Sequence, residues 1–511
     1  MAVDTVVPAD GGMSRPADVA NASRSVQQSW RVRTVGQALL VSQLIAMLIF
    51  SGYQYSHYAE TYDFGVYNQA WTLIAHGHMD PWSTLLQAPF WRNNAEFIMW
   101  PLSALYWVNP HPIDLLVVQD LAVVLTELVV FGWAMDLLER SAIGDKALRV
   151  AGLGTVLVLV LDPWAWNTIA FDFHSHTIAT LFVVVAGRDL WSGRTRRCWV
   201  WAIAAMVTDA PGALYVVGAG AAAAVSTREV RRTGIAVMGV GAAWFVMMTQ
   251  LGGDGVGGSG LGIWYGYLVG ATGGHVGLGS ILLGAPRHPG LLAHMFSLRW
   301  RILLEFLVVF GVVGVLSPWG LFPSAVVFLP TLFNASDGYL RIEQSFQSWP
   351  ALPFVLIGTL SVLVGLWKSR KWLAGVVAGW WWCAFCVVTA VALPAVPRYW
   401  LSVSDSAAGQ LAHLSRMIPQ SAEVVADNGV IGRFSARASV YELVGSSTPV
   451  NEPIIVFVVT PAEGVGEPPP QLSYRDISEL ESMGARRLVA KRGVFGLELR
   501  VPRGAHSARL P

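Results

Sequence analysis

Long apolar runs separated by short polar segments dominate the first 400 residues of the chain. Most of them are long enough to form an α-helix that crosses the roughly 30 Å hydrocarbon layer of a bilayer. The pattern therefore predicts an α-helical polytopic membrane protein. The runs cover residues 35–53, 112–138, 150–171, 175–191, 198–226, 233–251, 302–317, 319–333, 350–367 and 372–396.

The run 198–226 differs from the others, because arginines flank both of its ends and Asp209 and Pro211 interrupt it. Proline inside a helix removes a backbone donor and breaks or kinks the helix. We therefore expect a hairpin of two short helices whose turn at Asp209 points outward or to the middle of the membrane. With this hairpin, the basic loops alternate over about 11 crossings, from a cytoplasmic N-terminus to an outer C-terminus.

Three regions follow from this pattern. Residues 1–34 form a disordered cytoplasmic N-terminus, and residues 35–399 form the transmembrane domain with outer loops at 54–111 and 252–301. Charged residues become more frequent in residues 400–511, which predicts a small soluble extracytoplasmic α/β domain. Its expected elements are a helix at 407–418, strands at 423–427, 439–444 and 454–459, a helix at 474–483 and strands within 487–501.

Composition excludes several other classes of protein. Of the 511 residues, 54% are hydrophobic and only 13% are charged, against roughly 25% in soluble proteins. A soluble globule and a disordered chain are excluded on this ground. A net charge of +1 gives no basic face, so no nucleic-acid partner is expected. The three cysteines form no disulfide or zinc pattern. The sequence has no glycine-rich phosphate loop, so no nucleotide cofactor is expected.

Asp63 is the first candidate for chemistry. It lies about ten residues after the first apolar run and opens a segment that ends at His76 and Gly77. We expect an interfacial helix there, with its apolar face on the bilayer. Asp63 could be the N-cap of this helix or a catalytic carboxylate, and the two roles are compatible. The helical spacing is carried by Phe64, Tyr67, Trp71 and Ile74.

Asp172, His174 and His176 form a second cluster, at the outer junction of two predicted spans. Carboxylate and imidazole groups at this spacing could hold a divalent metal ion or serve as acid and base. The alternative is a polar turn between two helices. Arg92 and Arg341, in outer loops, could bind a phosphate through their guanidinium groups, or merely meet lipid headgroups.

Several motifs together resemble a bacterial family of predicted membrane proteins catalogued as domain of unknown function 2079. They are Asp63-Phe64-Gly65 followed by Gln69, Trp71 and Gly77, then Pro101-Leu102-Ser103-Ala104-Leu105-Tyr106, Gln119, Asp172-Phe173-His174 and Pro330-Thr331-Leu332-Phe333-Asn334. That family is in turn similar to the C-type (GT-C) glycosyltransferases, which implies a GT-C-like fold.

In such enzymes, acidic residues of two outer loops flank a cleft that polyprenyl-phosphate sugars enter from the membrane. The resemblance implies that Asp63 is the first of these acids and Asp172 the second, with Glu96 as a third carboxylate. It also makes Gln69, Glu96 and Asp209 candidates for substrate binding, beside Arg92 and Arg341. The second motif departs from the family pattern, because histidines stand where an acidic pair is common.

The sequence thus predicts a glycosyltransferase of the cytoplasmic membrane that transfers a sugar from a polyprenyl-phosphate donor to a cell-envelope or lipid-linked acceptor at the outer face. Asp63 is its expected base, and any divalent metal ion would bind at Asp172, His174 and His176. The expected partners are the lipid-linked sugar and membrane lipids, and no oligomeric state is predicted. One alternative function is a transporter or flippase of a lipid-linked intermediate, because discontinuous helices often form substrate sites. Another alternative is a structural or scaffolding membrane protein.

Overall fold

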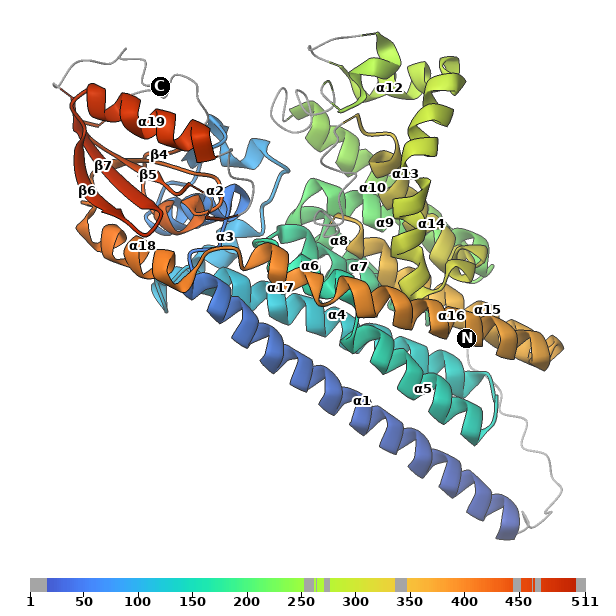
Figure 1. Cartoon of the computed structure of the whole chain (residues 1–511). Helices are drawn as coiled ribbons and strands as arrows, with labels where there is room; N and C mark the ends of the chain where they lie inside the picture. The colour runs from blue at the N-terminus through green and yellow to red at the C-terminus, as the bar shows by residue number, and fades with distance from the viewer. Residues whose placement is uncertain are drawn as a thin grey trace.

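The computed structural model is a long helical bundle with a small sheet-containing domain at one end (Figure 1). It describes residues 16–251, 262, 264–270, 276–335, 347–443, 452–461, 463–464 and 470–501. Within these residues, 6 helical segments are long and apolar enough to cross a membrane, which confirms the predicted polytopic helical class. They are Ser29–Ser56, Ile113–Arg140, Asp145–Ala170, Arg231–Leu251, Trp349–Ser369 and Lys371–Met417.

The helix on the predicted run 302–317 covers 289–310 instead, and residues 278–284 form a helix outside the runs. The other helices of the bundle lie on or near the predicted apolar runs. The helices are α1 (Pro16–Ser56), α4 (Ile113–Arg140), α5 (Asp145–Val160), α6 (Pro163–Ala170), α7 (Ser175–Trp191), α8 (Thr195–Thr208), α9 (Ala210–Ser226), α10 (Arg231–Leu251), α12 (Leu278–Gly284), α13 (Pro289–Phe310), α14 (Pro318–Leu332), α15 (Leu352–Ser369), α16 (Lys371–Ala392) and α17 (Ala395–Trp400).

The predicted break in the run 198–226 is confirmed. Helix α8 ends at Thr208, helix α9 begins at Ala210, and the carboxylate of Asp209 accepts the backbone N–H of Gly212 at 2.6 Å. Asp209 is therefore the N-cap of α9, a position that favours a short side chain with an acceptor oxygen. The two helices form the expected hairpin.

One predicted loop boundary is wrong. Residues 289–301, assigned to the outer loop 252–301, belong to α13 instead. Polar and charged side chains interrupt the apolar pattern there, but Arg299 is buried and donates to the carbonyl oxygen of Thr331 at 3.1 Å. Thr331 lies in the last turn of α14, where the backbone carbonyl groups have no donor within the helix. Arg299 supplies such a donor.

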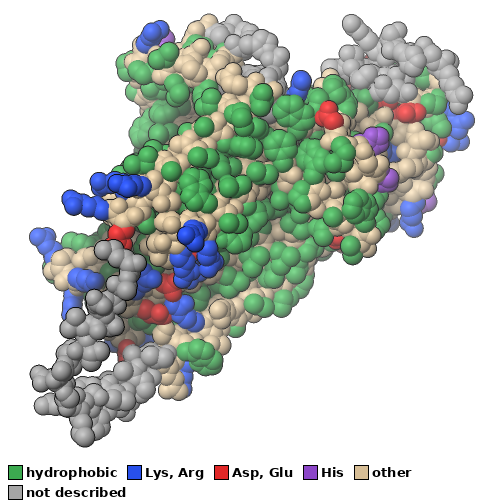
Figure 2. Space-filling view, turned by 180° about the vertical axis from the view of Figure 1, so that it is seen from behind, with side chains coloured by type: hydrophobic (Ala, Val, Ile, Leu, Met, Phe, Trp, Pro, Cys, Tyr) green, Lys and Arg blue, Asp and Glu red, His purple; other side chains and the backbone are tan. Residues whose placement is uncertain are grey.

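Charge is distributed unevenly along the bundle. Figure 2 shows apolar side chains over its middle, with Lys and Arg gathered at the end away from the sheet domain. Near that end, Asp136 bridges Arg33 of α1 at 2.8 Å and Arg188 of α7 at 2.6 Å. The predicted orientation across the membrane stays a prediction. It rests on the exposed basic residues of this end, among them Arg194, Arg196, Arg197, Lys368, Arg370 and Lys371.

The C-terminal region forms the predicted α/β domain. Its sheet has the order β4-β3-β5-β7-β6, in which β3 pairs parallel with β4 and β5 while β7 pairs antiparallel with β5 and β6. Each predicted element is found near its expected place. They are α18 (Asp405–Met417), β3 (Glu423–Ala426), β4 (Val440–Glu442), β5 (Ile454–Val459), α19 (Pro470–Ser482), β6 (Arg486–Lys491) and β7 (Val494–Arg500).

Helix α2 (Tyr62–Ala75) lies between this domain and the rest of the first outer loop, which contains β1 (Trp82–Ser83), β2 (Ala88–Pro89), η1 (Phe90–Arg92), α3 (Met99–Leu102) and η2 (Ser103–Trp107). The predicted helix and its end at His76 are confirmed. The predicted placement of its apolar face on the bilayer is wrong. Phe64 and Trp71 are fully buried in one core with Leu411 and Phe434 of the C-terminal domain, which covers the helix.

Candidate active site

Asp63 and His174 meet at the end of the bundle where the C-terminal domain packs. Asp63 is in the first turn of α2, and His174 directly precedes α7. The Nε2 atom of His174 lies 3.3 Å from Oδ2 of Asp63, across 111 residues of sequence. Because an ionised carboxylate only accepts hydrogen bonds, Nε2 is the donor. The two outer segments that were predicted to share a cleft are thus brought together.

Asp172 has a different role from the one predicted. It adopts a left-handed φ of 33°, which Asp tolerates better than most residues, and it is buried. Its carboxylate accepts the backbone N–H groups of Thr61 at 3.1 Å and Phe64 at 3.0 Å. Asp172 therefore caps α2 from another loop. The N-cap interpretation of Asp63 is wrong, because Thr61 holds that position and makes no side-chain cap bond.

Burial is the largest influence on the ionisation of Asp172, and it raises the pKa of this carboxyl to about 7. The nearby charge of Asp63 acts in the same direction, whereas the hydrogen bonds from Thr61 and Phe64 favour the ionised form and oppose it. The pKa of the buried Glu96 carboxyl is likewise raised by burial, against the hydrogen bond that it accepts from Tyr67.

Gln119 of α4 fixes the turn that carries both Asp172 and His174. Its amide nitrogen donates to the carbonyl oxygen of Asp172 at 2.7 Å, and its amide oxygen accepts the backbone N–H of His174 at 2.7 Å. The imidazole of His174 also stacks on Phe171, with ring centroids 5.0 Å apart. These contacts hold the ring where it faces Asp63. Sequence reasoning gave Gln119 no role in the site, although a buried glutamine in an apolar run is itself a signal.

Glu96 and Asp209 form a buried acidic pair behind His174. The hydroxyl of Ser175 lies 3.3 Å from Glu96 and 3.1 Å from Asp209, so its single proton bonds one of them at a time. Glu96 also accepts the hydroxyl of Tyr67. Both acids were predicted to bind substrate, but each is only 1% exposed and its oxygens contact protein donors. Their role in substrate binding stays a prediction. The residues that sequence reasoning missed here are Tyr67 and Ser175.

Gln69 does not line the site either. Its buried amide donates to the hydroxyl of Thr84 at 2.8 Å and to the carbonyl of Arg437 at 3.2 Å, and its oxygen accepts the hydroxyl of Ser83 at 2.9 Å. These bonds tie α2 to the β1–β2 hairpin and to the C-terminal domain. Both ends of its amide are occupied by protein groups, and the substrate-binding role of Gln69 stays a prediction.

The remaining candidates are placed as follows. Arg92 is exposed, and its guanidinium lies 5.7 Å from the ring centroid of Trp91. Arg341 lies outside the described residues. The ring of His176 is buried, 5.1 Å from that of His174. The structure thus brings only His174 directly to Asp63 among the candidates described.

The three residues predicted to bind a metal ion are not gathered around one point. Across the described ranges, no group of 3 or more His, Cys, Asp and Glu residues is arranged to hold a metal ion. The reason lies in the turn itself. The carboxylate of Asp172 points to the N-terminus of α2, whereas His174 points to Asp63, so the spacing of Asp172, His174 and His176 does not give a common focus.

Comparison with known proteins places the chain in a family. The model of the family described as Predicted membrane protein (DUF2079) matches residues 54–455. The chain belongs to this family. No curated protein matches the chain. The crystal structures of ArnT from Cupriavidus metallidurans, one bound to undecaprenyl phosphate and one in the apo state, are similar to it at 12% identity and a TM-score of 0.44, covering 90% of this chain and 97% of that chain.

The DUF2079 match includes every part of the candidate site. It begins before α2 and extends to the second residue of β5. Asp63, the turn with His174 and the C-terminal segment that touches α2 are therefore all within the family region. Helix α19 and strands β6 and β7 lie beyond it.

Proposed function

We propose that this DUF2079 protein is a glycosyltransferase that moves a sugar from a polyprenyl-phosphate donor to an acceptor hydroxyl of a cell-envelope or lipid-linked glycan, at the outer face of the cytoplasmic membrane. One observation carries the proposal. The side chain of Asp63 is 40% exposed and is bonded by His174, whose side chain is 8% exposed. A base needs this combination of access to the acceptor and a fixed orientation.

The reaction needs little else from these residues. His174 donates to Oδ2 of Asp63, which leaves the second carboxylate oxygen able to take a proton. As Asp63 removes the acceptor proton, the acceptor oxygen forms a bond to the anomeric carbon of the sugar. The bond from that carbon to the phosphate oxygen breaks, and the phosphate leaves with the electron pair. The proposed step uses neither a nucleotide nor a metal ion.

The place of Asp63 in the fold supports this chemistry. Helix α2 begins six residues after the end of α1 at Ser56, and the segment Ser29–Ser56 is one of the candidate membrane spans. A carboxylate at that point is within reach of a lipid-linked donor from the bilayer and of an acceptor from water. The aromatic ring of Tyr67, 5.8 Å from the ring of His174, completes the wall behind the pair.

The hypothesis of a transporter rested on the broken hairpin at Asp209. In the structure, the backbone N–H of Ala210 donates to the carbonyl of Asn94 at 2.7 Å, and the carboxylate of Asp209 is held by Gly212 and Ser175. Protein groups therefore satisfy the break and fasten it to the first outer loop. This arrangement favours a fixed hairpin over a substrate-lined gap, and so it supports the enzyme.

A deletion strain tests the proposal. Lipid-linked sugars and envelope glycans would be compared by mass spectrometry between the parent, the deletion strain, and the strain carrying either the wild-type chain or the Asp63→Asn variant. We expect a polyprenyl-phosphate sugar to accumulate and one glycan substituent to disappear on deletion, with recovery by the wild-type chain alone. Unchanged glycans on deletion would contradict the proposal. Full recovery by Asp63→Asn would instead indicate transport without transfer.

A further inference from the structure

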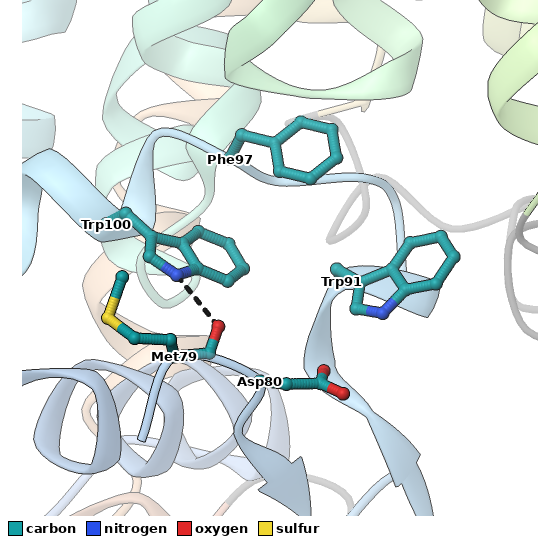
Figure 3. Close-up of a pocket in the computed structure, with 5 residues that line it drawn as sticks. All are labelled: Met79, Asp80, Trp91, Phe97 and Trp100. Atoms are coloured by element: carbon teal, nitrogen blue, oxygen red, sulfur yellow. Dashed lines mark hydrogen bonds between the residues drawn. The ribbon is translucent and has the colours of Figure 1, made fainter. Parts of the chain in front are cut away.

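A hollow of about 580 Å³ opens on the first outer loop, beside the candidate site. Figure 3 shows the rings of Trp91, Phe97 and Trp100 around this space, with the carboxylate of Asp80 also reaching toward it. Met79 completes the lining. The ring of Trp100 is held in place, because its Nε1 donates to the carbonyl oxygen of Met79 at 3.1 Å. The hollow is thus built from fixed aromatic surfaces and one acceptor group.

This combination of groups fits a particular kind of ligand. A sugar ring has apolar C–H faces, which pack on aromatic rings, and hydroxyl groups at its edge, which donate to a carboxylate. A prenyl or acyl chain matches the rings but gives the exposed Asp80 carboxylate no hydrogen-bond donor. A phosphate group would be repelled by the same charge. A neutral or amino-bearing pyranose satisfies both parts of the hollow.

The hollow and the candidate site share one stretch of chain. Residues 91–97 place Trp91 and Phe97 in the hollow and Glu96 in the buried acidic pair behind His174. Rings also connect the two places: the ring of Trp100 lies 6.3 Å from that of Phe90, which lies 6.0 Å from that of Tyr67. The buried ring of Phe90 therefore separates a ligand held in the hollow from Tyr67 in the wall of the candidate site.

We infer that this hollow is an acceptor subsite that binds a pyranose ring of the glycan to be modified, with Trp91 and Trp100 as stacking surfaces and Asp80 as the hydroxyl acceptor. The assignment of the sugar as the acceptor rests on the proposed glycosyl transfer. A donor is disfavoured here, because its charged phosphate would lie beside the Asp80 carboxylate. The binding of a sugar ring as such rests on the geometry of the hollow alone.

Saturation-transfer NMR with the full chain in lipid nanodiscs tests the binding. The probes are methyl glucopyranoside, methyl mannopyranoside and methyl galactopyranoside, each measured separately, and farnesyl phosphate as a short prenyl lipid. We expect ring-proton signals from at least one glycoside, weakened about tenfold by Trp91→Ala and also reduced by Asp80→Leu. The matched control is Trp82→Ala, an exposed tryptophan of the same outer loop outside the hollow lining, which should leave the signals unchanged.

Two results would overturn the inference. The first is that no glycoside gives a signal with the wild-type chain, or that the glycoside signals of the wild-type chain and of Trp91→Ala are equal. The second is a farnesyl signal that depends on Trp91 and grows in Asp80→Leu, which would make the hollow a lipid site. The outcome also separates this inference from the proposed function. Glycoside binding that depends on Trp91 without any sugar transfer would refute the transferase alone, whereas transfer with Trp91-independent binding would refute the subsite alone.

Discussion

The carboxylate of Asp172 accepts the backbone N–H of Phe64 at 3.0 Å, although the two residues are 108 positions apart in the sequence. Through this bond, the turn between α6 and α7 holds the first turn of α2. The same turn presents His174 to Asp63, so one short segment both fixes the helix and contacts the proposed base. Asp172 is thus a buried structural acid, whereas the side chain of Asp63 is 40% exposed.

Replacement of Asp172 should therefore act on stability first. In Asp172→Ala the backbone donors of Thr61 and Phe64 lose their acceptor in a buried place, which should cost about 1–3 kcal/mol. Asp172→Asn keeps one acceptor oxygen and should lose less. Melting temperatures in detergent would show this order. Equal stability of the Ala variant and the wild-type chain would contradict the capping role.

The contact between α2 and the C-terminal domain can be tested at Gly432 of η10 (Ile431–Phe434). The backbone N–H of Gly432 donates to the carbonyl of Glu60 at 3.0 Å, and a Cβ at this position would lie 2.6 Å from the Cβ of Glu60. Gly432→Ala should destabilise the chain by about 1–3 kcal/mol through overpacking, and should lower activity by displacing α2.

Gly409→Ala is the matched control for that variant, because a Cβ at Gly409 meets nothing within 4 Å. This glycine lies inside α18, where alanine should be neutral or stabilising by about 0.5–1 kcal/mol. If both alanine variants melt at the wild-type temperature, the close approach of Gly432 to Glu60 does not hold the domain in place.

Glu60 should make stability depend on pH. It is fully buried, and burial raises its pKa to about 8, with the charge of Arg433 opposing and that of Asp172 adding to the shift. Because the folded pKa exceeds the ordinary value of 4.5, the folded state holds this proton more strongly. The contribution of the protonated Glu60 carboxyl to the free energy of unfolding is complete below about pH 4.5 and is lost as the pH rises through about 8.

Glu60→Gln removes this titration, so its melting temperature should fall less than that of the wild-type chain between about pH 6 and pH 9. Asp172, whose pKa is raised in the same sense, is electrostatically coupled to Glu60, so the difference between the two curves reports Glu60 together with its effect on Asp172. Parallel curves for the wild-type chain and the variant would show that Glu60 does not titrate in the folded protein.

The sequence predicted the features that depend on neighbouring residues. The bounds of α2 followed from helical spacing and from Gly77. Gly77 has a φ of 93°, a conformation that is strained for residues with a Cβ but not for glycine, and the helix ends just before it. The elements of the C-terminal domain were found because strand alternation and turn residues are local signals. The break at Asp209 was found because a proline stands inside an apolar run.

The errors come from contacts between distant parts of the chain. Local capping rules selected Asp63 because it stands at the start of the predicted helix, whereas the acceptor that caps α2, Asp172, comes from a later loop. The apolar face of α2 was assigned to lipid, because periodicity shows that a face is buried but not what buries it. The bonds of Gln69 could not be predicted for the same reason, since its partners Ser83 and Arg437 lie on two other segments.

The central claim is that Asp63 is the base, and the Asp63→Asn variant tests it most directly. The purified variant and wild-type chain would be compared for the initial rate of sugar transfer, with the lipid-linked sugar that accumulates in the deletion strain as donor, and for melting temperature. Asparagine keeps an oxygen for His174, and Asp63 does not cap α2, so the fold should be unaffected. We expect an unchanged melting temperature with a rate lowered at least about 100-fold. Transfer by Asp63→Asn at the wild-type rate would contradict the account.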